Sequence, residues 1–299
     1  MEGYFGETAA LLTSVFWTVT GLSFEIASRR VGSLSVNMIR LVFAFVFLAI
    51  FTWISRGIPF PIDASSHAWI WLAVSGLVGF VFGDYFLFRA FAMVSSRVTM
   101  LVMTLVPPIT AFIGWLFLKE VMNLKEVAGM FMVVSGIGMA IMSRNPENRK
   151  IKLNYPVKGL MFALLGTIGQ AVGLVLSKYG MQDYDPFAAT HIRIMAGMIG
   201  FAFIIVMLKK KQLVKNAVKD PKGLKFIIIG SIFGPFLGVS FSLLAVQNTA
   251  TGIAATLMSL MPVLLIPPSI IFFKHKITWP EIAGAFVSVA GVALFFVRF

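Results

Sequence analysis

The sequence predicts an all-α integral membrane protein, with ten transmembrane helices arranged as two inverted five-helix repeats around a central cavity. Three observations support this fold class. Hydrophobic residues make up 59% of the chain and charged residues only 12%, whereas a soluble domain is roughly half apolar and a quarter charged. Apolar runs of membrane-spanning length follow one another along the chain. The third observation is an internal duplication.

The duplication is visible at a constant offset. Residues 89–144 align with residues 244–299 at an offset of 155, without a gap. The coincident pairs include Pro107 with Pro262, Lys119 with Lys274, Gly129 with Gly284, Gly136 with Gly291 and, upstream, Gly79 with Gly234 and Gly83 with Gly238. An internally duplicated, strongly apolar chain is typical of secondary transporters.

Ten apolar runs are long enough to cross a bilayer, since a spanning helix needs about 20 mostly apolar residues. In chain order the predicted spans are 7–28, 35–55, 68–91, 96–118, 124–142, 158–178, 186–208, 222–246, 250–273 and 278–297. Polar or charged stretches separate most of them, from Arg29 and Arg30 after the first span to residues 209–225 after the seventh. Only a few residues mark the breaks after the third and eighth spans.

The two repeats are predicted at residues 1–147 and 155–299, joined by a short basic linker at 148–154. Charges cluster at this boundary together with Pro146 and Pro156. Each repeat holds five spans, and an odd number forces the second repeat to enter the membrane upside down relative to the first. Because the chain already contains both inverted units, we expect it to work as a monomer.

Lysine and arginine predict the orientation, because cytoplasmic loops carry an excess of both. Loops after odd-numbered spans hold 18 of the 25 basic residues, and the opposite face holds 5. We therefore expect a multi-pass protein of the cytoplasmic (inner) membrane with both termini outside. The pI of about 10.2 then indicates loops held against anionic lipid, and no nucleic-acid partner is expected.

Several functional classes are disfavoured by what the sequence lacks. No basic segment precedes the first apolar run, so we expect no cleavable signal peptide. The chain has no cysteine, which excludes disulfides and thiolate chemistry, and His67, His191 and His275 are too scattered to suggest a metal site. No phosphate-binding loop, metalloprotease motif or nucleophile elbow is present. We expect neither an enzyme nor a bound cofactor.

Charged residues inside spans are costly and usually functional. They are Glu25, Arg40, Asp84, Arg89, Lys178 and Arg193. At an offset of 153 the repeat relates Glu25 to Lys178 and Arg40 to Arg193. Arg40 and Arg193 are candidates for binding an anionic substrate group; the alternative is that they extend toward the membrane surface.

Asp84 is the deepest acid, about two thirds along the third span. One hypothesis makes it the carboxylate that couples transport to protons, as functional sites often use buried acids. The other makes it a structural ion-pair partner of Arg40 or Arg89. Glu25, nearer the interface, is the second candidate for coupling.

Polar and amphipathic groups within or near the spans indicate a substrate cavity. The candidates are Trp17, Asp84, Thr104, Gln170, Gln247 and Ser259. Trp17 and Gln170 correspond at the offset of 153 and would supply a stacking surface and hydrogen bonds. The mixture favours a small zwitterion or amphipathic metabolite over a multiply charged phosphate.

Prolines predict broken helices. Pro107 and Pro262 interrupt repeat-related spans near mid-membrane, a pattern that points to a transporter site. We expect these two, together with a kink at Pro235, to act as gates; the alternative is that they only shape the bundle. Two glycine pairs at equivalent positions predict close helix packing: Gly79 with Gly83, and Gly234 with Gly238.

These motifs resemble the EamA-type proteins of the drug/metabolite transporter superfamily along essentially the whole chain. The resemblance rests on Phe16-Trp17, on Gly83-Asp84 followed by Ala90-Phe91, and on Leu105, Pro107, Glu120, Gly129 and Gly136, which recur as Leu260, Pro262, Gly284 and Gly291. It implies a cavity lined chiefly by helices 1, 3, 4, 6, 8 and 9, and transport, often export, of small metabolites such as amino acids. The sequence departs from the family pattern at His275, where a second glutamate is expected, and in its charge-derived orientation, since members commonly have cytoplasmic termini.

Three functional hypotheses follow. The favoured one is a secondary transporter that exports a small amino-acid-like or amphipathic solute by alternating access, with proton coupling as an open question. The second is a flippase for a lipid or lipid-linked substrate. The third is a non-transporting membrane scaffold or sensor.

Overall fold

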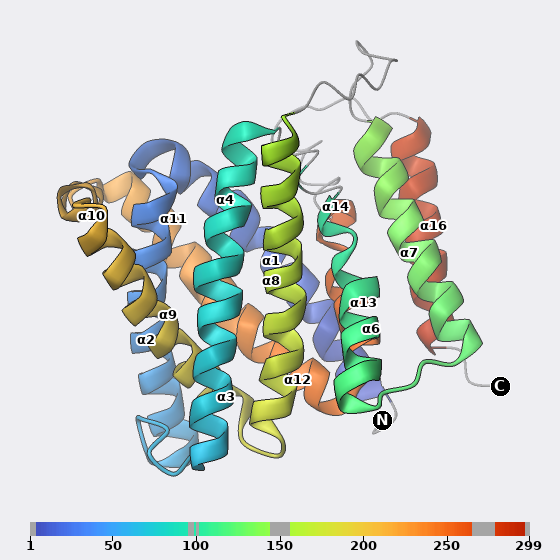
Figure 1. The fold of residues 1–299 in the computed structure, drawn as a ribbon, viewed down its shortest axis with the longest axis horizontal. Coiled ribbons are helices and arrows are strands. Elements are labelled where there is room, and N and C mark those ends of the chain that lie inside the picture. The colour runs from blue at the N-terminus through green and yellow to red at the C-terminus, as the bar shows by residue number, and fades with distance from the viewer. Residues whose placement is uncertain (1–3, 95–98, 100–101, 144–155, 265–278, 297–299) are drawn as a thin grey trace.

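The part of the chain that the structure describes is built from helices joined by short connections. The computed structural model describes residues 4–94, 99, 102–143, 156–264 and 279–296. Its elements are α1 (Phe5–Val31), α2 (Ser33–Arg56), α3 (Ser66–Gly76), η2 (Leu77–Gly83), α4 (Asp84–Met93), α6 (Val106–Leu118), α7 (Leu124–Ser143), α8 (Val157–Met181), α9 (Pro186–Met207), α10 (Lys211–Val218), α11 (Pro221–Ser231), η3 (Ile232–Gly238), α12 (Val239–Asn248), α13 (Thr251–Met258), α14 (Met261–Leu264) and α16 (Trp279–Phe296). Figure 1 shows the long helices running between an upper and a lower end.

Six helices of the described residues are long and apolar enough to cross a membrane. They are Phe5–Ser28, Ser33–Arg56, Ser66–Leu87, Val157–Met181, Pro186–Met207 and Pro221–Asn248. Two shorter apolar helices, Val106–Leu118 and Ile282–Phe296, accompany them. Large side chains such as Ile199 and Phe286 stay exposed on the outside of the bundle, as expected where lipid replaces water.

Consecutive long helices enter and leave the bundle at alternating ends (Figure 1). The connections α2–α3, α6–α7, α8–α9 and α12–α13 lie at the lower end, whereas α1–α2 and the passage from α9 to α11 lie at the upper end. Helix α1 begins and α16 ends at the lower end, where the Tyr4 hydroxyl donates a 2.7 Å hydrogen bond to the Phe296 carbonyl.

The upper connection between α9 and α11 contains a short helix that the sequence pattern did not predict. Helix α10 packs against α2 and α11, and its Ala217 is buried beside Phe24 and Ile227. Its lysines are exposed. Asp220 then caps α11, accepting a hydrogen bond from the Gly223 amide at 2.9 Å. A segment that looks like a charged loop is therefore folded onto the bundle by a few apolar residues.

Two π-helical segments occupy equivalent places in the two halves. Segments η2 and η3 are both seven residues long, and their bounds differ by the same offset of 155 that relates the sequences. Pro235 lies inside η3, as expected of a distorted helix. Phe80 holds the corresponding place in η2, so the π geometry does not require a proline. It is a property of the repeated unit.

Each π-helical segment packs on the first long helix of the other half. Segment η2 contacts α8, and η3 contacts α1. A Cβ added to Gly173 would come within 2.9 Å of the Gly79 Cα atom, and one added to Gly238 within 2.7 Å of the Trp17 ring. The glycines permit this approach because they present no side chain. The two halves are thus interlocked.

Helix breaks also recur in the two halves. Helix α6 begins at Val106 after a turn at 104–105, and α14 begins at Met261 after a turn at 259–260. Pro107 lies in the first turn of α6, where a missing backbone N–H costs nothing. The proline therefore begins a new helix segment and does not bend a continuous one. The side chain of Pro262 lies outside the described residues.

Candidate functional site

Asp84 lies at a junction of three helices inside the bundle. It is the first residue of α4, directly after η2, and is 7% exposed. Its carboxylate forms an ion pair with Arg40 of α2 through Oδ2. The other oxygen, Oδ1, accepts a 2.9 Å hydrogen bond from Nε2 of Gln170 on α8. Both carboxylate oxygens therefore have a partner.

The glycines of η2 bring Gln170 to this carboxylate. A Cβ on Gly83 would lie 3.2 Å from the Gln170 Nε2 atom, so a larger residue would crowd the amide. The same Nε2 atom also lies 3.3 Å from the Gly79 carbonyl oxygen, to which it donates. A π-helical segment replaces the regular α-helical hydrogen bonds by an i→i+5 pattern and is frequent at functional sites. The close crossing and the irregular backbone together position the polar contact.

Arg193 of α9 lies beside the same junction. It is 6% exposed, and its guanidinium carbon lies 5.0 Å from the centre of the Phe80 ring. Its Nε atom is buried without a hydrogen-bond partner, and so is the Nε atom of Arg40. We call Arg40, Asp84, Gln170 and Arg193 the inner cluster. The structure thus brings together residues for which the sequence suggested different roles. Arg40 and Arg193 were candidates for anion binding, Asp84 for proton coupling and Gln170 for the substrate cavity.

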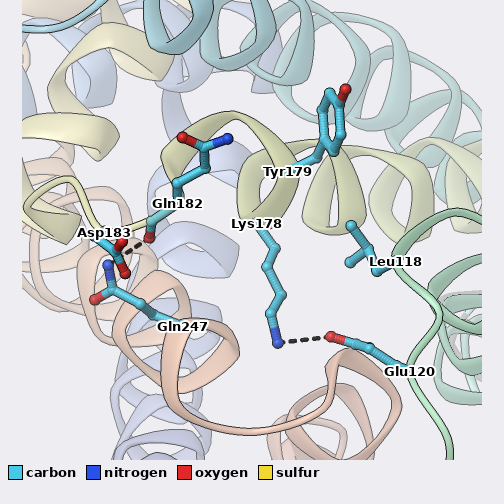
Figure 2. A pocket seen from close by; sticks show the side chains of 7 residues that line it. All are labelled: Leu118, Glu120, Lys178, Tyr179, Gln182, Asp183 and Gln247. Carbon is cyan, nitrogen blue, oxygen red and sulfur yellow. Dashed lines mark hydrogen bonds and ion pairs between the residues drawn. The ribbon is translucent and has the colours of Figure 1, made fainter.

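A second group of polar residues surrounds a cavity at the lower end. The cavity has a volume of about 440 Å³ and is lined by Leu118, Glu120, Lys178, Tyr179, Gln182, Asp183 and Gln247. Figure 2 shows Lys178 and Glu120 pointing toward one another across it. Two of the predicted site residues, Lys178 and Gln247, therefore belong to a separate place from the inner cluster.

The Lys178–Glu120 ion pair connects α8 with the segment after α6. The Lys178 Nζ atom lies 2.6 Å from Glu120 Oε1 and donates to the Thr249 carbonyl at 2.7 Å. Glu120 Oε2 accepts from both the backbone N–H and the hydroxyl of Thr251, at 2.8 and 2.6 Å. We call these four residues the lower latch. Glu120 was absent from the predicted site because it follows a span; the family signature was the signal that could have found it.

The α8–α9 turn beside the cavity is held by polar contacts. Gln247 donates to the carbonyls of Gln182 and Tyr184, at 2.7 and 3.1 Å. The Tyr184 hydroxyl donates to Asp63 at 2.8 Å, and Asp63 also pairs with Arg56. Burial and the charge of Asp63 raise the pKa of Tyr184 to about 12, against the opposing effect of Arg56. The pKa of Asp63 is lowered: its slight burial acts upward, but the Tyr184 hydrogen bond and Arg56 outweigh it.

The remaining predicted residues are dispersed. Trp17 packs against Gly238, and this contact is the repeat-related counterpart of the contact between Gln170 and Gly83. Thr104 and Ser259 lie in the turns that interrupt the broken helices, where the Ser259 hydroxyl donates to the Thr256 carbonyl at 2.7 Å. The side chain of Glu25 lies outside the described residues.

These features define a multi-pass, all-helical membrane protein built from two related halves. The chain belongs to the EamA-like transporter family, whose pattern matches residues 4–142 and again residues 157–297. It therefore belongs to a family of membrane transporters and not to an enzyme family, and the resemblance noted from the sequence is confirmed.

The chain is also similar to individual proteins. An uncharacterized transporter, YoaV, of Bacillus subtilis (strain 168) is 23% identical over 140 residues, which are 45% of this chain and 46% of that protein's length. A solved structure described as "Crystal structure of protein" has a TM-score of 0.73 and 15% sequence identity, with 97% of this chain and 96% of that chain covered. The second likeness shows the fold alone.

Proposed function

We propose that the chain is a secondary transporter that exports a small amphipathic metabolite by alternating access. In this proposal ten spans form two inverted repeats around a central substrate site, with both termini outside the cytoplasmic membrane. The observation that carries the proposal is the contact between Asp84 and Gln170. It places a membrane-embedded carboxylate where the first repeat meets the second.

The position of the inner cluster favours a transport role. Charged groups in a membrane are costly and usually lie along a transport pathway. In transporters with inverted repeats, the substrate site lies at the repeat interface, next to interrupted helices. The π-helix η2, which ends directly before Asp84, is such an interruption. A rocking of one half against the other would change the surroundings of this carboxylate.

The lower latch supports the alternating-access part of the proposal. Its ion pair joins residues of the two halves, and Figure 2 shows both side chains lining the adjoining cavity. Its opening and closing would control access from the lower end. The broken helices at Pro107 and at the turn before α14 supply segments that can adjust without bending a whole helix.

Proton coupling is assigned to Asp84 in this proposal. Protonation would weaken the ion pair with Arg40 and the charge-assisted hydrogen bond from Gln170, and so would link the proton to the contact between the halves. Glu25 is the second candidate for this role. The orientation and the direction of transport rest on the lysine and arginine distribution and on the family resemblance.

Counterflow into liposomes tests the proposal. The purified protein is reconstituted with an internal panel of amino acids and small organic acids, and uptake of the labelled solutes is measured at two pH values. We expect saturable flux whose pH dependence is lost in Asp84→Asn. Asp220→Asn, which removes a carboxylate outside the spans, is the matched control and retains it. If Asp84→Asn keeps both the rate and the pH dependence of the wild type, Asp84 is not the coupling group.

The same liposomes separate the other hypotheses. If the protein scrambles a fluorescent phospholipid but gives no flux of any solute, the metabolite-transporter hypothesis is wrong and the flippase hypothesis replaces it. Neither flux nor scrambling, with intact folded protein, would favour a scaffold or sensor.

A further inference from the structure

Arg193 is a buried cation whose Nε–H has no hydrogen-bond partner among the described residues. It is 6% exposed, and its buried Nε–H donates to no hydrogen-bond acceptor among the described residues. Its guanidinium lies over the Phe80 ring and is close enough to Asp84 to feel the charge of that carboxylate. A guanidinium carries five N–H donors in a fixed plane, and a ring stacked on that plane satisfies none of them.

Asp84 is already engaged by other residues. Its Oδ2 atom pairs with Arg40 and its Oδ1 atom accepts from Gln170. The inner cluster therefore holds two positive charges against one negative charge. Burying an unpaired charge costs several kcal/mol, so a protein retains such a charge where a ligand completes the pairing. An anion of single charge would neutralise the cluster.

Two glycines allow the neighbouring helix backbone to lie close to Arg193. Gly76 packs against the Arg193 backbone, and a Cβ on Gly79 would lie 3.3 Å from the Arg193 Nη2 atom. Both glycines belong to the segment that ends in η2. The guanidinium therefore lies against Gly79 and Phe80 of this segment, neither of which offers it a carboxylate.

We propose that Arg193 binds the carboxylate of the transported solute, and that this solute is a monocarboxylate without an α-ammonium group. The inference rests on the proposed transport function and names its substrate class. A guanidinium binds a carboxylate through two parallel hydrogen bonds. The ammonium group of an amino acid would meet the excess positive charge of the cluster, and its natural partner, Asp84, has both oxygens occupied. A dianionic phosphate would overcompensate the single excess charge.

Matched solutes test this charge requirement. Two series share one body and differ in charge: 3-phenylpropionate, phenylalanine and 3-phenylpropionamide, and propionate, alanine and propionamide. The wild-type protein is titrated with each at constant ionic strength, and thermal unfolding in detergent is followed together with counterflow in liposomes. We expect a carboxylate in at least one series to stabilise the protein and to be transported. The corresponding amino acid and amide should bind at least about tenfold more weakly, a difference that one good charged contact supplies.

Variants locate the effect at Arg193. Arg193→Gln should weaken carboxylate binding at least about tenfold, and Arg193→Lys, which keeps the charge but loses the planar fork, should give an intermediate loss. Arg89→Gln is the control, since Arg89 is exposed and stacks on Tyr85. If Arg193→Gln does not fold, the comparison of solutes on the wild type and on Arg193→Lys still decides.

The outcomes separate this inference from the function on which it rests. Flux of the amino acids in preference to the carboxylates overturns the inference and leaves the transporter standing, as does carboxylate binding that Arg193→Gln leaves unchanged. Absence of flux for every solute, with folded protein, overturns both.

Discussion

Lys178 on α8 and Glu120 after α6 form an ion pair of 2.6 Å that joins the two halves of the chain at the lower end of the bundle. Both side chains are mostly shielded, with 24% and 14% of their surfaces exposed. Thr249 and Thr251 add hydrogen bonds to the same two residues. These contacts make the lower latch a polar link between the halves that is separate from the inner cluster.

Removing either charge of the lower latch should destabilise the state seen here. We expect Lys178→Met and Glu120→Gln each to cost about 1 to 3 kcal/mol, between the values for exposed and fully buried pairs. The double variant should cost less than the sum of the two. Thermal unfolding in detergent measures this, with the exposed Lys222→Met as control. Strictly additive costs would mean that the two residues do not interact.

The glycine crossing between η2 and α8 should tolerate alanine better on one side than on the other. A Cβ on Gly173 would meet the Gly79 Cα and N atoms at 2.9 and 3.1 Å. A Cβ on Gly79 would stand 3.8 Å from the Gly173 Cα atom and would meet the Arg193 Nη2 atom at 3.3 Å. We expect Gly173→Ala to destabilise the protein by about 1 to 3 kcal/mol. Gly79→Ala should cost less in thermal unfolding, because the one close atom it meets is the end of a long side chain, which can shift. Equal effects would contradict the asymmetric crossing.

Tyr184 should titrate at unusually high pH. Its pKa is raised to about 12 by burial and by Asp63. Its stabilising contribution is therefore fully present below pH 10, the ordinary pKa, and is lost as the pH rises through about 12. The absorbance of ionised tyrosine, taken as wild type minus Tyr184→Phe, reports the titration. Asp63→Asn should shift it downward, because the neighbouring negative charge is gone; an unshifted curve would exclude the contact.

The contribution of Asp63 to stability depends on pH in the opposite direction to that of Tyr184. The pKa of Asp63 is lowered in the fold, where Tyr184 and Arg56 outweigh the opposing effect of burial. Its contribution is present above the ordinary pKa of 3.8 and is lost as the pH falls through the folded value. Asp63→Asn should therefore flatten the loss of stability below about pH 4 without changing stability trends near neutrality.

The π-helix η3 should survive the loss of its proline. Phe80 holds the equivalent place in η2, and the π geometry is the same length there. We expect Pro235→Ala to change the unfolding temperature little and to preserve transport. The matched substitution Phe80→Ala should cost more, because it removes a buried ring that contacts Arg193. Loss of transport in Pro235→Ala alone would assign the proline a gating role.

The charge-derived orientation can be tested directly, because the chain has no cysteine. Asn216→Cys on α10 lies at the upper end and Gln182→Cys at the lower end of the bundle (Figure 1). In intact cells an impermeant maleimide should label only the second. Labelling of residue 216 alone would invert the proposed orientation.

Periodicity and repetition predicted the membrane fold well, because both follow from local sequence. The predicted span 186–208 and the helix Pro186–Met207 differ by one residue. The short amphipathic helix α10 was not predicted, because its lysines suggest a charged loop although a few of its apolar residues pack against the bundle. The π-helical segments were not predicted either, because a GxxxG pair indicates that two helices pack closely but does not indicate a π-helical backbone.

The site was predicted only in part, for a physical reason. A repeat alignment shows which residues are equivalent, and equivalent residues of an inverted pair need not lie together. Trp17 and Gln170 are equivalent and lie against different glycines, Gly238 and Gly83. Asp84 and Arg193, by contrast, have no such relation and meet in one cluster. Contacts across the halves depend on the tertiary arrangement, which a single sequence does not display.

The interlocking of the halves has a consequence for biogenesis. Helix α1 packs chiefly against α11, α12 and η3 of the second half, and η2 packs chiefly against α8. The first half therefore leaves the translocon with the surfaces for its partner helices still uncovered, and it must wait in the bilayer until the second half has been synthesised. Two separately expressed halves should each be short-lived alone and should assemble when made together.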